Sequence, residues 1–230
     1  MALDPAALAR LRRFAALLVA ANERLNLTRI TGQAELLEKH LLDALLGAPL
    51  LAPEGRAPGS LVDVGSGGGV PGIPLAILWP AARVLLLEAE ARKAEFLREA
   101  ARELGLAGVE VVAGRAEVLG RDPARRDRFQ AGTLRAVGPV GTCLELGLPF
   151  LAPGGRLLLY RGPSGAAEEL AEARAVAPLL GGGEVDAREV ALPSGARRWL
   201  IRVEKALATP ERYPRRDGVP ARRPLGPGSA

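Results

Sequence analysis

The sequence predicts an α/β protein built on a mostly parallel sheet of seven strands. Short apolar runs alternate with helical patterns between residues 58 and 177, the arrangement that covers both faces of a parallel sheet with helices. Two later runs flank a turn at residues 193–195, which predicts a closing antiparallel hairpin. A glycine cluster follows the first run, at the place where open sheets of this kind bind ligands.

The N-terminal part, residues 1–57, is predicted to be a helical extension. Asp4 can cap a helix that begins at Pro5, because aspartate accepts hydrogen bonds from free N–H groups and proline suits the first helical position. A second amphipathic run covers Glu35 to Leu46. Prolines and glycines between residues 53 and 59 predict a linker to the sheet.

The sheet and its crossover helices fill residues 58–205, which we interpret as one α/β domain. Apolar runs predict strands at residues 61–64, 84–87, 109–112, 133–137, 156–160, 185–192 and 198–203. Helical patterns lie between them in a stretch ending at Trp79 and at residues 91–104, 144–151 and 168–177. The alternation of strand and helix places the carboxyl ends of the parallel strands at one edge of the sheet.

The last 25 residues, 206–230, show no periodicity and predict a basic, proline-rich C-terminal arm. The whole chain carries 31 basic and 26 acidic residues, a net charge of +5. Five arginines and two acids in the arm give it a net charge of +3. More than half of the excess positive charge therefore lies on this arm.

The single cysteine and the single histidine exclude several classes of protein. One cysteine, Cys143, permits no internal disulfide and no cysteine zinc cluster. One histidine, His40, permits no paired-histidine metal site, and we predict no bound metal. No apolar run approaches the roughly 18 residues that span a membrane, and no secretory signal is visible. These observations predict a cytoplasmic protein without a membrane partner.

The glycine cluster between Val62 and Gly72 lies between the first strand and the first crossover helix. Glycines there let the backbone approach a ligand, and Glu88 ends the second strand, where an acid accepts hydrogen bonds from ribose hydroxyls. A dinucleotide pattern fits formally at Gly67, Gly69 and Gly72. The register Asp63-x-Gly65-x-Gly67-x-Gly69, together with the closing hairpin, instead resembles S-adenosylmethionine-dependent methyltransferases with their Rossmann-like fold.

The chain lacks motifs that particular methyl acceptors require, and this limits the type of acceptor atom. The Asn/Asp-Pro-Pro-aromatic motif of amino-group methylation is absent after the fourth strand, which continues from Thr133 to Pro139. Carbon-5 methylation of a pyrimidine needs a cysteine nucleophile, and Cys143 reads as a small buried thiol. A ring nitrogen such as guanine N7 carries a lone pair and no proton, so it needs alignment but no general base. This base-poor sequence permits that chemistry without identifying the substrate.

The residues resemble one family closely, the bacterial 16S rRNA guanine-N7 methyltransferases, also called the glucose-inhibited division protein B family. The matching blocks occur in the family's order from about residue 22 to the tail. They are Asn26-Leu27-Thr28, Lys39 to Asp43, Val62 to Leu75, Arg92-Lys93-x-x-Phe96, Gly114 to Glu117, Arg135-Ala136-Val137, Leu148 to Leu151 and Tyr213-Pro214-Arg215-Arg216-x-Gly218. Together these blocks are specific, whereas the glycine loop alone is not.

The resemblance implies methyl transfer from S-adenosylmethionine, with S-adenosylhomocysteine as product, to a guanine in the decoding-region loop of small-subunit rRNA. It implies catalytic roles for Arg135 and Arg161, which would orient the base through O6 while N7 stays free. Implied cofactor contacts are Gly65, Gly67, Val70, Glu88, Ala89, Glu90, Ala116, Glu117 and Arg135.

The resemblance also implies an RNA interface and a partner, 16S rRNA or the small ribosomal subunit. His40 and Asp43 share a helix face and are expected to contact RNA at the mouth of the cleft. Arg215 and Arg216 are expected to hold rRNA phosphate from the arm. The protein is expected to act as a monomer.

Two alternatives remain open from the residues alone. A ribosome-assembly or RNA-binding protein that keeps the fold without catalysis shares the basic arm, but gives no reason for an intact glycine loop and Glu88. A methyltransferase acting on a small molecule or a protein would turn over without RNA, and its activity would be insensitive to salt.

Overall fold

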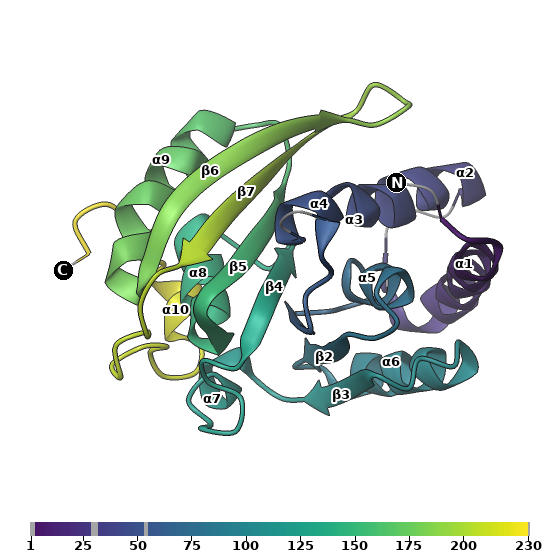
Figure 1. The fold of residues 1–230 in the computed structure, drawn as a ribbon, viewed down its shortest axis with the longest axis horizontal. Helices are drawn as coiled ribbons and strands as arrows, with labels where there is room; N and C mark the ends of the chain where they lie inside the picture. The colour runs from purple at the N-terminus through teal and green to yellow at the C-terminus, as the bar shows by residue number, and fades with distance from the viewer. Residues whose placement is uncertain (1–2, 29–31, 53–54, 230) are drawn as a thin grey trace.

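The structure, a computed structural model, describes residues 3–28, 32–52 and 55–229. Its centre is one seven-stranded sheet with the strand order β3-β2-β1-β4-β5-β7-β6 (Figure 1). The strands are β1 (Ser60–Val64), β2 (Arg83–Glu88), β3 (Val109–Ala113), β4 (Phe129–Arg135), β5 (Leu151–Arg161), β6 (Gly182–Ala191) and β7 (Arg197–Lys205). The first five are parallel, and β6 and β7 form the predicted antiparallel hairpin on β5. The predicted fold class is confirmed.

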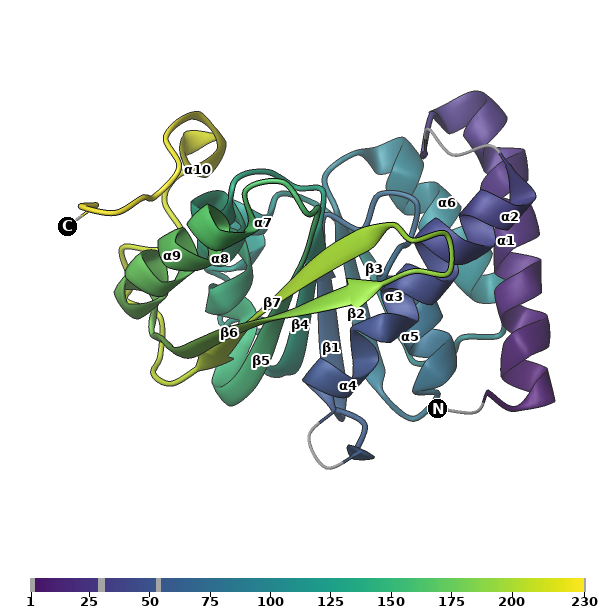
Figure 2. The same ribbon diagram turned by 90° about the horizontal axis from the view of Figure 1, so that it is seen from above.

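Helices cover both faces of the sheet (Figure 2). On one face pack α1 (Pro5–Leu25), α3 (Asp43–Leu46), α4 (Ala48–Leu51), α5 (Gly72–Leu78) and α6 (Ala91–Glu103). On the other face pack α8 (Val140–Gly147) and α9 (Ala166–Val176), while α7 (Ala116–Leu119) and the short α10 (Val219–Arg222) lie beside them. Alternate residues of a strand enter the two cores, as Leu158 and Leu159 of β5 do.

The N-terminal helices pack on one face of the sheet. The Asp4 side chain accepts a hydrogen bond from the Ala7 backbone N–H at 2.7 Å and caps α1, and Phe14 is fully buried against the core. The second helical run contains α2 (Gln33–Leu36), a π-helical segment η1 (Leu37–Leu42) and then α3. The π-helical segment lies within the amphipathic run, which predicted only a regular helix.

Two element boundaries differ from the predicted ones. The fourth strand ends at Arg135 and not at residue 137, because Ala136 turns the chain with a left-handed φ of 57°. The predicted helix at residues 144–151 begins earlier, at Val140, and ends at Gly147. A short 3₁₀ turn, η3 (Leu148–Phe150), then leads into β5.

Residues 206–229, which we call the C-terminal segment, pack along α7 and α8. Arg126 donates to the carbonyl oxygens of Thr209, Pro210 and Tyr213 at 2.6, 3.2 and 3.0 Å. Arg121 donates to three further carbonyls of the segment, on Glu211, Arg212 and Pro214. Hydrogen bonds from arginines to backbone carbonyls do not require apolar residues at regular spacing. The hydrophobic pattern of the sequence therefore did not predict this packing.

The C-terminal segment is also anchored by a buried ion pair. Glu145 of α8 has a fully buried side chain and accepts from the backbone N–H of Arg215 at 2.7 Å and from its guanidinium at 2.6 to 3.0 Å. Further along, Thr142 donates to the Pro220 carbonyl at 2.7 Å. The segment therefore belongs to the folded body and reaches the start of α8.

Within the described ranges, no helix is long and apolar enough to cross a lipid bilayer.

Candidate active site

The glycine loop joins β1 to α5 and turns sharply at the carboxyl edge of the sheet. Gly65 has a left-handed φ of 74°, and a Cβ there would lie 2.8 Å from a methyl group of Val137. Its backbone N–H and that of Ser66 both donate to the carbonyl oxygen of Leu87 on the neighbouring strand, at 2.8 and 3.0 Å. The loop is thus fixed to β2 and passes within contact distance of the chain that follows β4.

A buried carboxylate holds the loop to the sheet from below. Asp63 accepts from the Thr133 hydroxyl at 2.7 Å and from the Gly72 backbone N–H at 3.2 Å. Its side chain is buried, and burial raises the pKa of Asp63 to about 6 despite these hydrogen bonds. The acid at the start of the motif therefore braces β1, β4 and the first turn of α5, and it does not face the cavity above the loop.

Glu88 ends β2 beside the loop, as predicted. Its two carboxylate oxygens accept from the backbone N–H groups of Gly67 and Glu90, each at 2.8 Å. The side chain is largely buried, and backbone donors on either side fix its orientation. Each oxygen keeps a second lone pair, so the carboxylate can still accept hydrogen bonds from ribose hydroxyls.

A cavity of 410 Å³ opens between this loop, the N-terminal helices and the end of β4. It joins residues that are distant in sequence: Leu18, Leu27, Thr28, His40, Gly65 to Gly68, Val70, Glu88, Lys93 and Arg135 to Val137. Of the predicted cofactor residues, Gly65, Gly67, Val70, Glu88 and Arg135 lie in its wall. Ala89 and Glu90 follow directly after Glu88, and Glu90 forms a 2.9 Å ion pair with Lys93.

Ala116 and Glu117, expected beside the adenine ring, begin α7 at the next strand end and do not line this cavity. Both are buried, and the Glu117 carboxylate accepts from the Gly218 backbone N–H at 3.0 Å. Arg115 and Asp217 form a 2.9 Å ion pair alongside. The C-terminal segment therefore covers this side of α7, and the adenine contacts stay a prediction.

Arg135 lies where β4 ends, with a side chain that is 17% exposed. Its Nη2 donates to the carbonyl oxygen of Lys39 at 2.7 Å and to Nδ1 of His40 at 3.2 Å, and it lies 3.2 Å from Oδ2 of Asp43. The structure thus brings the predicted catalytic arginine together with both residues expected to contact RNA. Asp43, however, has a side chain that is only 1% exposed, so RNA cannot reach it in this conformation.

Arg161, the second predicted catalytic arginine, lies on the other face of the sheet. Arg135 is paired in register with Tyr160, and side chains of successive strand residues point to opposite faces. The Arg161 guanidinium is engaged by both oxygens of Glu169 on α9 and by the Gly138 carbonyl at 2.8 Å. The two arginines therefore do not converge, and the structure gives Arg161 a partner in the α9 layer.

Of the two arginines predicted to hold RNA phosphate, one has structural partners. Arg215 is committed to Glu145 and to the Arg223 carbonyl, whereas Arg216 is exposed at the surface of the C-terminal segment. Cys143 is 2% exposed in α8, on the face opposite the cavity, and burial raises its pKa to about 11. A nucleophilic role for this thiol is not compatible with that position.

Residues that the sequence analysis did not single out complete the cluster around Arg135. Arg198 of β7 places its Nε 3.3 Å from the same Oδ2 of Asp43. Near the hairpin tip, the Ser194 backbone N–H donates to Glu38 at 2.7 Å, so the tip of the hairpin reaches the π-helical segment η1. These contacts join β7 to the N-terminal helices over more than 150 residues, a separation that leaves no local sequence signal.

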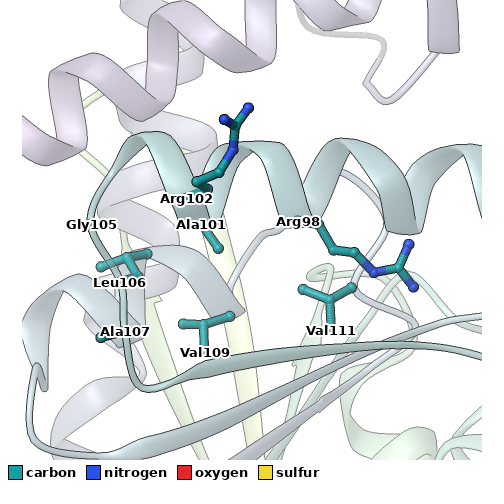
Figure 3. A pocket seen from close by; sticks show the side chains of 8 residues that line it. All are labelled: Arg98, Ala101, Arg102, Gly105, Leu106, Ala107, Val109 and Val111. Atoms are coloured by element: carbon teal, nitrogen blue, oxygen red, sulfur yellow. The ribbon is translucent and has the colours of Figure 1, made fainter.

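A second cavity, of 420 Å³, lies between α6 and the edge strand β3 (Figure 3). Leu106, Val109 and Val111 form its apolar floor, while Arg98 and Arg102 point away from each other at its rim. None of the glycine-loop residues line it. It is therefore a separate surface hollow at the sheet edge and not part of the candidate active site.

Among the described residues, no group of three or more histidine, cysteine, aspartate or glutamate side chains could hold a metal ion.

The fold and the glycine loop are those of a Rossmann-like α/β protein with a cavity at the carboxyl edge of its sheet. Among solved structures, a putative O-methyltransferase from Klebsiella pneumoniae matches with a TM-score of 0.57 at 17% identity, covering 90% of this chain and 92% of that one. The cofactor-bound protein Rv0187 from MTB matches with a TM-score of 0.58 at 22% identity, covering 89% and 92%. Likeness at these identities establishes the fold alone.

Sequence comparison identifies the family. Residues 7–191 match the model of the family described as rRNA small subunit methyltransferase G. The chain is 48% identical to the ribosomal RNA small subunit methyltransferase G of Synechococcus elongatus, covering 91% of this chain and 86% of that protein. It is 41% identical to the protein of the same name from Roseiflexus castenholzii, covering 97% and 94%. The chain belongs to the rRNA small subunit methyltransferase G family, and S-adenosylmethionine is its methyl donor.

Two buried groups of the site are expected to change protein stability with pH in opposite directions. Burial, reinforced by Arg135, lowers the pKa of His40 to about 4 from an ordinary 6.5. In the unfolded chain His40 binds a proton below pH 6.5, whereas in the folded chain it binds one only below about pH 4. The free energy of unfolding therefore falls as the pH is lowered from 6.5 to 4. Asp63, with a folded pKa of about 6 against 3.8, takes up its proton first in the folded chain, so stability rises as pH falls from 6 to 3.8.

Replacing His40 by phenylalanine removes one of these opposing contributions. Between pH 7 and pH 4.5 the wild-type free energy of unfolding is expected to fall by on the order of 2 kcal/mol relative to the variant. Urea unfolding at the two pH values measures this difference. The contributions of the remaining titratable groups are the same in both proteins and cancel. Parallel pH profiles for wild type and variant would show that His40 is not held neutral by the fold.

Proposed function

We propose that the protein transfers a methyl group from S-adenosylmethionine to N7 of a guanine in the decoding-region loop of 16S rRNA. The observation that carries this proposal is membership of the rRNA small subunit methyltransferase G family over most of the chain, with an intact glycine loop and Glu88 in place. The small ribosomal subunit or its rRNA is then the partner, and the expected place of action is the cytoplasm. We expect a monomer.

The residues around the 410 Å³ cavity fit the methyl donor. The glycine loop would let the backbone approach it, and the Glu88 carboxylate would accept hydrogen bonds from its ribose hydroxyls. S-adenosylmethionine supplies an electrophilic methyl group. The protein's task is then to align the acceptor nitrogen with that methyl group and to exclude water from the site.

The titratable groups of the cavity wall favour an acceptor that carries no proton. His40 is held neutral, with Nδ1 accepting from Arg135 and Nε2 2.7 Å from the Thr28 hydroxyl, so neither nitrogen is free to act as a base. Lys93 is paired with Glu90. Guanine N7 has an available lone pair and needs no deprotonation before attack. Arg135, in the wall of the same cavity, would orient the base through O6.

Labelled S-adenosylmethionine tests the activity directly. Incubation with small subunits from a strain that lacks the endogenous enzyme is expected to place one methyl group on 16S rRNA, and mapping is expected to locate it on N7 of a guanine. RNA binding should weaken steeply as salt rises, since phosphate contacts release counterions. Turnover on a protein or small molecule without RNA, or cofactor binding without any transfer to rRNA, would overturn the proposal.

A further inference from the structure

The strongest unexplained feature of the site is the way in which the Arg135 guanidinium is held. Nη2 donates its two hydrogen bonds to the Lys39 carbonyl and to Nδ1 of His40, and Oδ2 of Asp43 forms an ion pair with the same nitrogen at 3.2 Å. Nη1 is buried and makes no hydrogen bond to any described residue. Nε is then the one guanidinium donor that is neither bonded nor buried among the described residues.

The state of His40 is fixed by this arrangement. An arginine nitrogen only donates, so Nδ1 of His40 must be the acceptor and its proton must lie on Nε2, pointing to the Thr28 hydroxyl. Protonation of Nδ1 would remove an acceptor and place a second positive charge beside Arg135. The low pKa of His40, about 4, is consistent with this neutral tautomer.

Asp43 supplies the charge that compensates the buried guanidinium. Its Oδ2 lies 3.2 Å from Arg135 and 3.3 Å from Arg198, and its side chain is 1% exposed. A carboxylate so deeply buried acts on its neighbours and not on a ligand arriving from solvent. The backbone turn at Ala136, with a φ of 57°, directly follows Arg135 and directs the chain toward Val137 in the cavity wall.

Holding Nη2 has a chemical consequence for guanine recognition. Arginine grips the guanine edge with a pair of donors that span O6 and N7. Its end-on pair is Nη1 with Nη2 and its side-on pair is Nε with Nη2, so both pairs need Nη2. With Nη2 occupied, Arg135 can offer single-donor contacts only. A single contact to O6 leaves the N7 lone pair unobstructed, whereas a paired grip would cover the atom that must attack the methyl group.

We propose that His40 and Asp43 are positioning residues that hold Nη2 of Arg135, His40 through a hydrogen bond and Asp43 through an ion pair, and that they restrict this arginine to a single-donor contact with the target guanine. The role expected for them from the sequence, direct contact with RNA, is replaced by action through Arg135. This inference rests on the proposed function, because it presumes that N7 is the acceptor.

Kinetics of two variants test the inference with a matched control. Asp43→Asn removes the negative charge that is paired with Nη2, and His40→Phe removes one of its two hydrogen-bond acceptors. Both are expected to lower kcat at least tenfold with KM for small subunits unchanged or lower, since a paired grip binds the guanine but blocks N7. The control Glu38→Gln neutralises a carboxylate that also joins the helix to the hairpin, without touching Arg135, and kcat is expected to stay within threefold.

A readout that needs no substrate separates this inference from the proposed function. In nitrogen-15 spectra of the 24.0 kDa protein, an anchored Arg135 guanidinium should give distinct, slowly rotating Nη signals, assigned with Arg135→Lys. Asp43→Asn should collapse them, and Glu38→Gln should not. Unchanged signals, or Asp43→Asn raising KM with kcat unaltered, would overturn the positioning role. A wild-type protein that anchors Arg135 but methylates no rRNA would overturn the proposed function alone.

Discussion

Glu145→Gln is expected to destabilise the protein by roughly 2–3 kcal/mol and to release the C-terminal segment. The Glu145 side chain is 0% exposed and accepts four hydrogen bonds from Arg215, one from its backbone and three from its guanidinium. A glutamine keeps the shape but replaces one acceptor by an NH₂ group that faces a donor, and it leaves a partly buried positive charge without compensation. Breaking one side of a buried ion pair costs about 3 kcal/mol or more, reduced here because Arg215 is 26% exposed.

Urea unfolding of wild type and Glu145→Gln measures this loss, which should lower the midpoint by about 1 M for a typical urea slope. Trypsin provides a local readout, because Arg212, Arg215, Arg216 and Arg222 lie in the segment that should detach and none of them precedes a proline. Glu95→Gln is the matched control: its ion pair with Arg98 is exposed, so the change should stay within about 0.5 kcal/mol. Equal midpoints for the two variants would show that the pair does not anchor the segment.

The contact behind this prediction shows where sequence reasoning ends. Hydrophobic periodicity predicted all seven strands, because each strand buries apolar side chains at a fixed spacing on one or both faces. Glu145 and Arg215 are 70 residues apart and neither is part of a periodic pattern. Arg126 donates hydrogen bonds to backbone carbonyls, and because every residue has a carbonyl, the sequence does not show which ones it binds. A proline-rich segment held by such contacts therefore has the sequence pattern of a free arm.

The candidate site divides in the same way. The glycine loop and Glu88 were predictable, because backbone freedom and a strand-end acid at the right spacing are local requirements of ligand binding. Asp43 was found by the family motif, but its burial was not, since a carboxylate on a helix face reads as exposed until the opposing strands are placed. The sheet faces on which the Arg161 and Arg198 side chains lie could not be predicted, because they depend on strand register. The pairing of β5 with its neighbours sets these faces, and a shift of one residue would exchange them.

Glu88→Ala is expected to weaken S-adenosylmethionine binding roughly 10- to 100-fold. Hydrogen bonds from a charged carboxylate contribute about 1.5–3 kcal/mol each, and a tenfold change in affinity corresponds to about 1.4 kcal/mol. The same substitution also removes the acceptor for the backbone N–H groups of Gly67 and Glu90, so the loop loses the contact that orders it beside the ribose position.

Calorimetry with S-adenosylmethionine alone measures this effect without rRNA. Glu88→Asp keeps the charge on a shorter side chain and is expected to bind within tenfold of wild type. The two variants together distinguish the effect of losing the carboxylate from the effect of shortening the side chain. Glu95→Ala, on the exposed face of α6, controls for a general change of charge and should leave the affinity unchanged. Wild-type affinity in Glu88→Ala would place the ribose elsewhere. The alternative position for the ribose would then be beside α7, where Ala116 and Glu117 lie under the C-terminal segment and outside the cavity.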